Sequence, residues 1–494
     1  MADQSRKCLS TVRLQVGVVS VSYFLFRIGA TMFDTIVGPY LLRVVCEKRF
    51  LENRTICDRL EQNPVIENEV REYAGFYFIL YRLFLNIPAI FSGLFCGAWS
   101  DRKGRKIPML FPCVGIILSA MCFIISLYMG PLAVWVALLG TLIQSVSGNT
   151  PVFAMTVNSY IASGSDNDQR TKQISMLYAM SSFGMSFGAF LAGLLKWELL
   201  ISYGIVIGFQ CLTAFVIILF LRETGNNPKN GYTEHKSETE TNGITCSNLS
   251  SGIKSYISLL TEKGTNSVQT VVIVQLCLTF IYGCDINGVE DVLLMYVTAR
   301  PFNWSKSWYS YYVSIRHIST GFVLLVLLPF LSNVLKLSDC TVISLGLLCN
   351  VSRYVGTGLS NKSWMIYALM TVWSVSLVTR PCNWSTLSKA ANEQEQGKMF
   401  TLFSITDTVS KCVGSMVYVN LYGATVAFCP SIAFYLMGFV NVVMLLAGIA
   451  SICYRRVIQC NKNVAKMEPT EKSNLQDSCN SSKLQYVSTK MDLK

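Results

Sequence analysis

Charged side chains lie inside segments that are otherwise apolar, and their types suit an anion and a proton. Arg27 and Asp34 stand seven residues apart in the first apolar segment, so two helical turns bring them to the same face. An arginine fork holds a carboxylate or phosphate at two points, and a carboxyl group can carry a proton. A charge within a membrane span costs free energy unless it faces protein or water, so each one marks a candidate site.

Further candidates follow along the chain. The charged set comprises Arg27, Asp34, Arg82, Asp291, Arg316, His317 and Arg380. His317 is the only histidine in an apolar segment, and imidazole titrates near neutral pH, so His317, Asp34 and Asp291 are candidates for proton coupling. Arg380 precedes Pro381, where we expect the helix to break. The aromatic residues that could stack on a solute, or simply pack, are Tyr77, Tyr81, Tyr178 and Trp373.

Structural roles compete with these functional ones. Asp407 and Lys411 have the i,i+4 spacing of a self-neutralising helix pair, with the acid first. Arg353 lies in the middle of its segment, where it is expected to pair with a neighbouring span. Glu290 and Asp291 lie near a segment end, where water could hydrate them. No metal-ligand spacing, phosphate loop or catalytic cluster occurs, so the sequence predicts no metal, no cofactor and no enzyme.

The elements that must position these residues are membrane-spanning helices. The chain has 494 residues, of which 52% are hydrophobic and only 14% charged, whereas soluble domains carry about 25% charged residues. A helix needs roughly 20 apolar residues to cross a bilayer, and it satisfies its own backbone polar groups there. The sequence therefore predicts an all-α membrane protein with twelve transmembrane helices in two six-helix halves. Their expected limits are 14–43, 74–98, 107–128, 132–162, 171–195, 201–221, 269–298, 307–333, 339–360, 364–388, 397–422 and 426–454.

Polar segments divide the chain into five regions. They are a cytosolic N terminus (1–13), an N-terminal six-helix bundle (14–221), a cytosolic linker (222–268), a C-terminal six-helix bundle (269–454) and a cytosolic tail (455–494). The chain has 41 lysine and arginine residues, and this orientation puts most of those that lie outside the spans on the cytosolic side, as the positive-inside rule requires. Asn53 then begins an outer Asn-Arg-Thr glycosylation sequon. Two six-helix units around a central linker indicate a transporter architecture.

A short charged turn, GAWSDRKGRK (97–106), separates the second and third spans. It resembles the signature of the major facilitator superfamily, and the matching residues are Gly97, Asp101, Arg102, Gly104, Arg105 and Lys106. The resemblance implies that Asp101 faces the start of span eleven and latches the cytosolic gate shut, and Gly104 permits the tight reversal. The alternative is that the basic residues only enforce the positive-inside bias. The equivalent turn of the second half, SNVLKLSDC, is degenerate.

Three other stretches narrow the resemblance to the proton-coupled folate transporter family, including its thymic stromal cotransporter and lysosomal branches. They are DVLLMYVTARPFNW (291–304), LSKAANEQEQGKMF (387–400) and YGATVAFCPSIAFYL (422–436). The chain also departs from that family, because Tyr178, Ile286 and Trp384 stand where its coupling glutamate, histidine and arginine are expected.

The same resemblance implies an outer disulfide that begins at Cys57. Asn303 occupies the position of the family's second cysteine, so a Cys46–Cys57 bond is one alternative and no bond is the other.

Together these features predict a secondary transporter that moves a small organic anion by alternating access, coupled to protons. The resemblance implies folate-like compounds, bacterial cell-wall fragments or cyclic dinucleotides as cargo. The expected partners are that solute, protons and the lipid bilayer, but no nucleic acid, since the net charge of +12 suits an anionic inner leaflet. The plasma membrane or an endolysosomal membrane would hold the protein, and its oligomeric state stays open. The alternative function is a non-transporting receptor or scaffold that retains the fold.

Overall fold

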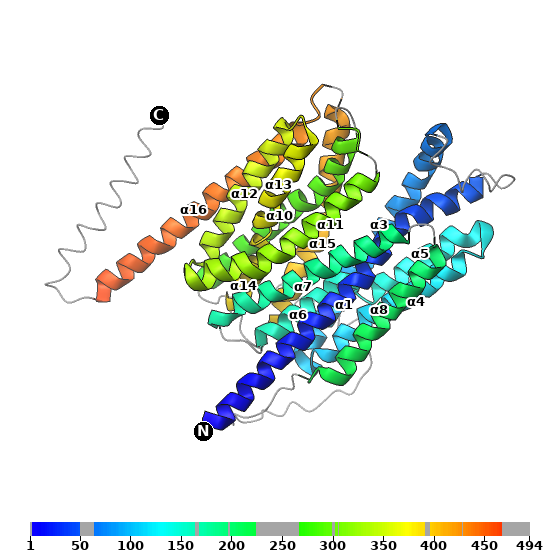
Figure 1. Cartoon of the computed structure of the whole chain (residues 1–494). Helices are drawn as coiled ribbons and strands as arrows, with labels where there is room; N and C mark the ends of the chain where they lie inside the picture. Colours follow the sequence, from blue (N-terminus) through cyan, green and yellow to red (C-terminus); the bar gives the residue numbers. More distant parts are fainter. Residues whose placement is uncertain are drawn as a thin grey trace.

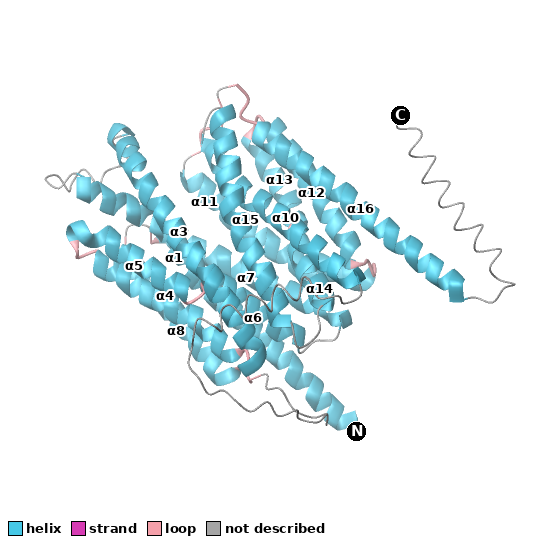
Figure 2. Ribbon diagram, turned by 180° about the vertical axis from the view of Figure 1, so that it is seen from behind, coloured by secondary structure: helices cyan, strands magenta, loops and turns pink. Residues whose placement is uncertain are grey.

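The computed structural model is helical throughout its regular elements in the part of the chain that it describes (Figure 2). The described residues are 2–49, 64–163, 167–195, 198–223, 266–298, 302–304, 306–390, 396–426 and 428–466. Most of the predicted linker and tail lie outside these ranges, and so do Asn53 and Cys57. The side chains of Asp101 and Arg102 also lie outside the described set.

Six spans form the N-terminal half. They are α1 (Ala2–Arg49), α3 (Pro64–Lys103), α4 (Lys106–Ser126), the pair α5 (Ala133–Val146) and α6 (Asn149–Ser163), α7 (Asn167–Leu194) and α8 (Leu199–Phe220). A short 3-10 turn, η2 (Gly130–Leu132), precedes α5.

Six more spans form the C-terminal half. They are α10 (Asn266–Thr298), α11 (Lys306–Phe322) continued by the π-helical turns η3 (Val323–Leu327) and η4 (Phe330–Val334), α12 (Asp339–Leu359), the pair α13 (Ser363–Ser376) and α14 (Thr379–Ala390), α15 (Gln396–Thr425) and α16 (Ile432–Lys466). All twelve predicted spans are therefore confirmed as helical.

By length and hydropathy alone, nine helical stretches of the described chain qualify as membrane spans. Segments α10, α13–α14 and α15 are not among them. The equally interrupted pair α5–α6 does qualify, as Gly130–Ser163, so the break is not the reason. Charged residues lower the hydropathy of these segments instead, with Arg380 in α14 and charges in the middle of α10 and α15. The features that make these spans candidate sites thus also hide them from a hydropathy scan.

Two spans are interrupted at their middle. Gly148, between α5 and α6, has a φ of +90°, which a residue with a side chain rarely adopts. Residues 377–378 separate α13 from α14, and Pro381 lies in the first turn of α14, where its missing N–H leaves no bond unmade. The predicted break near Pro381 is confirmed.

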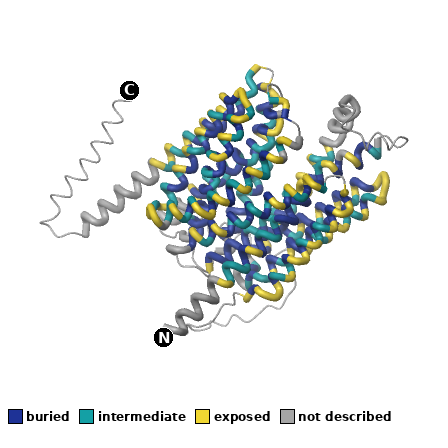
Figure 3. The backbone as a smooth tube through the Cα atoms, viewed as in Figure 1, coloured by how far each residue is buried: buried dark blue, intermediate teal, exposed yellow. Residues whose placement is uncertain are grey.

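The helices of each half pack closely. Helix α1 lies against α7 and α8, and α10 lies against α15. Gly184 and Gly188 of α7 face the backbone oxygens of Phe24 and Ile28 on α1, where a Cβ atom would collide. Small residues four apart let two helices approach in this way within a membrane. Buried residues lie in the centre of each bundle and exposed residues around its circumference (Figure 3). Many of the exposed residues are large and apolar.

The two halves meet along four helix pairs: α7 with α11, α7 with α14, α3 with α15 and α6 with α15. We call the end of the molecule at which α1 begins and α8 finishes the linker side, and the opposite end the far side. The halves lie together at the linker side and diverge toward the far side (Figure 1). Trp384, Phe400 and Phe403 of the C-terminal half belong to the apolar core of the N-terminal half, which joins the halves near the linker side.

Candidate functional site

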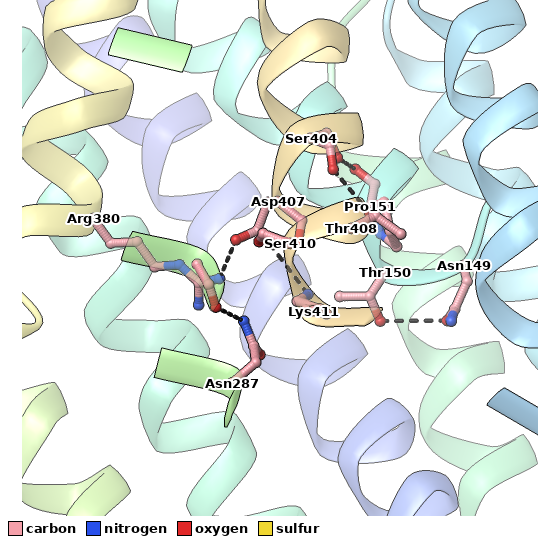
Figure 4. Close-up of polar contacts among 11 residues, drawn as sticks. Asn149, Thr150, Pro151, Asn287, Arg380, Ser404, Asp407, Thr408, Ser410 and Lys411 are labelled. Carbon is pink, nitrogen blue, oxygen red and sulfur yellow. Dashed lines mark hydrogen bonds and ion pairs between the residues drawn. The ribbon is translucent and has the colours of Figure 1, made fainter. Parts of the chain in front are cut away.

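A charged cluster lies at mid-depth on the face that the C-terminal half turns toward the N-terminal half (Figure 4). Arg380 Nη2 donates to Asp407 Oδ1 at 2.5 Å, and Lys411 Nζ lies 3.2 Å from Asp407 Oδ2. Their side chains are 29%, 19% and 37% exposed in that order, so water reaches all three. The expected Asp407–Lys411 pair is present, and Arg380 makes it a triad with an excess of positive charge.

Asp34 of α1 is the exposed acid of this region. No ion pair or hydrogen bond joins its side chain to another residue of the described chain. Three cations act on it electrostatically: Arg27 of its own helix, Arg82 of α3 and Lys411 of α15. Asp34 therefore stands in a positive field that comes from both halves.

A second group of charges lies nearer the far side. Arg82 Nη2 of the N-terminal half is 3.8 Å from Asp291 Oδ1 of the C-terminal half, and the side chains are 65% and 29% exposed. Ser415 Oγ donates to Asp291 Oδ2 at 2.5 Å. From the sequence, Asp291 could have been an acid that is simply hydrated. In the structure it bridges the two halves.

Arg316 and His317 of α11 lie between that group and the interior of the C-terminal half. Arg316 Nη2 is 2.9 Å from Glu290 Oε1 and 3.2 Å from His317 Nε2. A guanidinium group only donates, so His317 Nε2 must accept, and the ring carries its proton on Nδ1. His317 is therefore neutral in this structure.

Behind Arg316 lies a buried network. The Trp373 ring, 2% exposed, has the guanidinium groups of Arg316 and Arg353 each 4.2 Å from its centroid. Asp285 accepts hydrogen bonds from Tyr418 Oη and, at 2.6 Å, from Asn441 Nδ2. The expected structural role of Arg353 fits this geometry. The idea that Trp373 stacks on a solute is wrong, because guanidinium groups cover the ring.

Of the three positions at which the resemblance implies coupling residues, two are aromatic here and lie together. The rings of Tyr178 on α7 and Trp384 on α14 are 6.5 Å apart, and Trp384 also packs on Phe403 at 4.3 Å. Ile286, at the third position, is 4% exposed. Aromatic packing between the halves thus occupies two of these positions, and none of the three side chains is a carboxylic acid or a histidine.

Polar contacts close the space between the halves at the linker side. Arg170 Nη1 of α7 donates to the Ser388 carbonyl oxygen of α14 at 3.1 Å. The Thr171 and Ser385 hydroxyls are 2.7 Å apart, and Thr171 Oγ1 donates to Asp339 Oδ1 at 3.1 Å. These residues were missed by sequence reasoning, because ordinary polar residues at helix ends show no distinctive spacing. These contacts join the halves at the linker side, while the charged clusters keep part of their side-chain surface exposed.

The signature turn is ordered by a residue that follows α8. Gly104 has a φ of +102°, and a Cβ atom there would collide with Glu223 Oε1. The Lys106 backbone N–H donates to the same oxygen at 3.1 Å, and Arg105 Nη1 donates to the Ser159 carbonyl oxygen. The expected role of Gly104 in the reversal agrees with its positive φ. Gly97 is buried in α3, and the Asp101 latch stays a prediction.

The structure describes only one of the two cysteines of the possible Cys46–Cys57 bond. Cys46 is disulfide-bonded, whereas Cys57, its predicted partner, lies outside the described residues. Within the described chain, no three His, Cys, Asp or Glu side chains gather in a possible metal site.

Two six-helix halves with charged residues in the space between them define the architecture of a secondary transporter. Residues 19–415 match the family model described as Major Facilitator Superfamily. The chain therefore belongs to the major facilitator superfamily. It is a multi-pass membrane transporter by family and not an enzyme, as the sequence predicts.

Comparisons with individual proteins agree. The chain is 24% identical to the proton-coupled folate transporter of Rattus norvegicus over 87% of this chain and 91% of that protein. It is 22% identical to the lysosomal proton-coupled steroid conjugate and bile acid symporter of Homo sapiens over 90% and 95% of the two chains. The crystal structure of the human organic anion transporter MFSD10 has the same fold, with a TM-score of 0.70, 15% identity and coverage of 88% and 99%. The expected similarity to the proton-coupled folate transporter family is confirmed.

Proposed function

We propose that this protein transports a small organic anion together with protons by alternating access between its two halves. The observation that carries the proposal is the set of charged side chains between the halves, most of them in contact with solvent, in which basic side chains outnumber acids. That set contains Arg27, Asp34, Arg82, Glu290, Asp291, Arg316, Arg380, Asp407 and Lys411. Membrane interiors tolerate such residues chiefly along substrate and ion pathways.

The balance of charge around Asp34 would couple proton binding to anion binding. Each acid of this set except Asp34 has an ion-pair partner in the described chain. When a proton neutralises Asp34, the negative charge that partly balances Arg27, Arg82 and Lys411 is gone. An anionic solute can then take its place. Because opposite charges attract strongly where water is scarce, proton and anion bind cooperatively.

Asp34 is a better carrier than the other two proton candidates. His317 already accepts a hydrogen bond from one guanidinium group, so its acceptor nitrogen is engaged. Asp291 is held by Arg82 and Ser415. Asp34 alone of the three combines exposure with the lack of a fixed partner among the described residues.

The relatives support the same function. Two of them are described as proton-coupled, one for folate and one for steroid conjugates and bile acids. We infer a cytosolic linker side, with both termini there, and a far side that faces outward or the lumen of an endolysosome. In that orientation, the contacts at the linker side support a conformation that would accept solute from the far side.

The test is uptake into liposomes that contain the purified protein. Labelled bile acids and folates are offered at acidic and at neutral outside pH, with and without a proton ionophore. We expect accumulation at acidic outside pH that the ionophore abolishes. The Asp34→Asn variant should still exchange solute across the membrane but should not accumulate it against a gradient, because the proton can no longer be carried.

Glu47→Gln is the matched control. Glu47 is an acid of the same helix, it lies outside the cluster, and its Oε1 is 3.1 Å from Arg43 Nε. It should accumulate solute like the wild type. Accumulation by Asp34→Asn equal to that of the wild type would exclude Asp34 as the carrier. Failure of every anion to move under any condition would favour the receptor or scaffold.

A further inference from the structure

We propose a carboxylate-binding subsite formed by Arg27, Arg316 and His317, which Glu290 fills when no substrate is bound. This inference rests on the proposed function and deepens it, because it names the chemical group of the solute and the place that receives it. The substrate would carry a carboxylate, and that carboxylate would displace the protein's own.

Arg316 supplies the first half of the argument. It is 3% exposed, yet among the described residues Nε and Nη1 have no hydrogen-bond partner, and only Nη2 is engaged. A buried guanidinium group normally has most of its five N–H groups paired, because an unpaired buried donor is costly. Its stacking on Trp373 at 4.2 Å fixes the plane of the group. Arg316 is thus a rigid fork with unused donors.

Arg27 brings a second cation from the other half. Its Nε is buried without a partner, and none of the acids in the described chain forms an ion pair with it. Its Cβ lies against Gly184 of α7, and Ser186 on the same helix donates to the Ser314 carbonyl oxygen of α11 at 3.1 Å. Arg27 therefore lies beside the α7–α11 seam, and its charge acts on His317.

His317 completes the set of donors. Because its Nε2 accepts from Arg316, its Nδ1–H is left to donate. The cations of Arg27 and Arg316 repel each other, but both can bind one anionic group, and the His317 N–H can donate to the same group. A bound carboxylate would neutralise this like-charge pairing and hold the halves together around the solute.

Glu290 shows which anion the subsite accepts. Its carboxylate contacts Arg316 at 2.9 Å, but its side chain is 43% exposed while that of Arg316 is 4% exposed. The guanidinium group is thus fixed and the carboxylate is free to leave. A planar carboxylate already fits one end of the fork, so the incoming group is expected to have the same shape.

The decisive experiment measures binding rather than flux. Wild-type protein in lipid nanodiscs is titrated calorimetrically with glycocholate, a carboxylate, and taurocholate, the sulfonate with the same steroid, and with folic acid. Glu290→Gln removes the competing carboxylate and keeps the shape of the side chain. We expect it to tighten glycocholate binding about tenfold, the equivalent of one charge-assisted hydrogen bond.

Arg316→Gln should weaken glycocholate binding about thirtyfold or more, because it removes the buried partner of the bound carboxylate. Arg316→Lys keeps the charge without the fork, and should bind glycocholate more weakly than wild type while remaining folded. In the Arg316→Gln background, Glu290→Gln should have no effect. Glu47→Gln, which removes the i,i+4 ion pair with the exposed Arg43 elsewhere on α1, is the matched control and should leave all three affinities unchanged.

The outcomes separate the two proposals. If none of the three anions binds the wild-type protein, the proposed function fails, and the subsite fails with it. If an anion binds but Glu290→Gln does not tighten glycocholate binding, the subsite is refuted and the transporter stands. Equal tightening for taurocholate and glycocholate would overturn the preference for a carboxylate.

Discussion

The triad of Arg380, Asp407 and Lys411 allows a quantitative prediction. Asp407→Asn removes the partner of two cations at once, one held at 2.5 Å and the other at 3.2 Å. A hydrogen bond to a charged group contributes about 1.5–3 kcal/mol, and stranding a buried charge costs about 3–5 kcal/mol. Because these side chains are 19–37% exposed, water offsets part of the loss. We therefore expect Asp407→Asn to destabilise the protein by about 2–4 kcal/mol.

Lys411→Gln should cost less, about 1 kcal/mol or below, because Asp407 keeps its contact with Arg380 and Lys411 is the most exposed of the three. The assay is the thermal unfolding midpoint of each variant in nanodiscs. The double variant Asp407→Asn/Lys411→Gln should be more stable than Asp407→Asn alone, since one stranded cation is gone. Equal losses for the two single variants, or no recovery in the double variant, would refute this account of the triad.

The remaining predictions concern the signature turn and the bridge between the halves. Gly104→Ala should lower the unfolding midpoint and slow transport, because alanine disfavours a φ of +102° and its Cβ would push Glu223 away. In a Glu223→Ala background, Gly104→Ala should lower the midpoint by less. An equal decrease in both backgrounds would show that the backbone alone matters. Arg82→Gln should change stability by less than about 1 kcal/mol, because the pair with Asp291 is long and exposed. Exchanging the two charges, Arg82→Asp with Asp291→Arg, should restore whatever transport each single change removes, and a double variant as slow as the worse single one would contradict a bridge between the halves.

Much of the architecture follows from the sequence, because hydropathy and helix length are local properties. The twelve spans and the break near Pro381 could be read directly. The i,i+4 spacing of Asp407 and Lys411 also predicted a real contact. Arg380 as the third member could not be predicted, since it approaches from another helix and its position depends on how α14 packs against α15.

Contacts across the two halves were the least predictable features. Arg170 and Thr171 close the linker side through a carbonyl oxygen and hydroxyl groups, which occur throughout the chain without a distinctive pattern. The sequence left open whether Trp373 stacks on a solute or simply packs, and in the structure two arginines from separate helices cover its ring. Such arrangements depend on tertiary packing, and one sequence carries no direct record of it.

The two interrupted spans hold the same place in their halves, the fourth of six. Each resumes with a helix whose third residue is proline, Pro151 in α6 and Pro381 in α14. Both new helix starts lie beside one stretch of α15, where Ser404 donates to the Pro151 carbonyl oxygen and Asp407 binds Arg380 (Figure 4). This correspondence is what the duplication of an ancestral six-helix unit would leave. Each interruption also brings the first-turn N–H groups of one helix and the last-turn carbonyl groups of the helix before it to the same place, so polar backbone groups of both signs lie in the middle of the span.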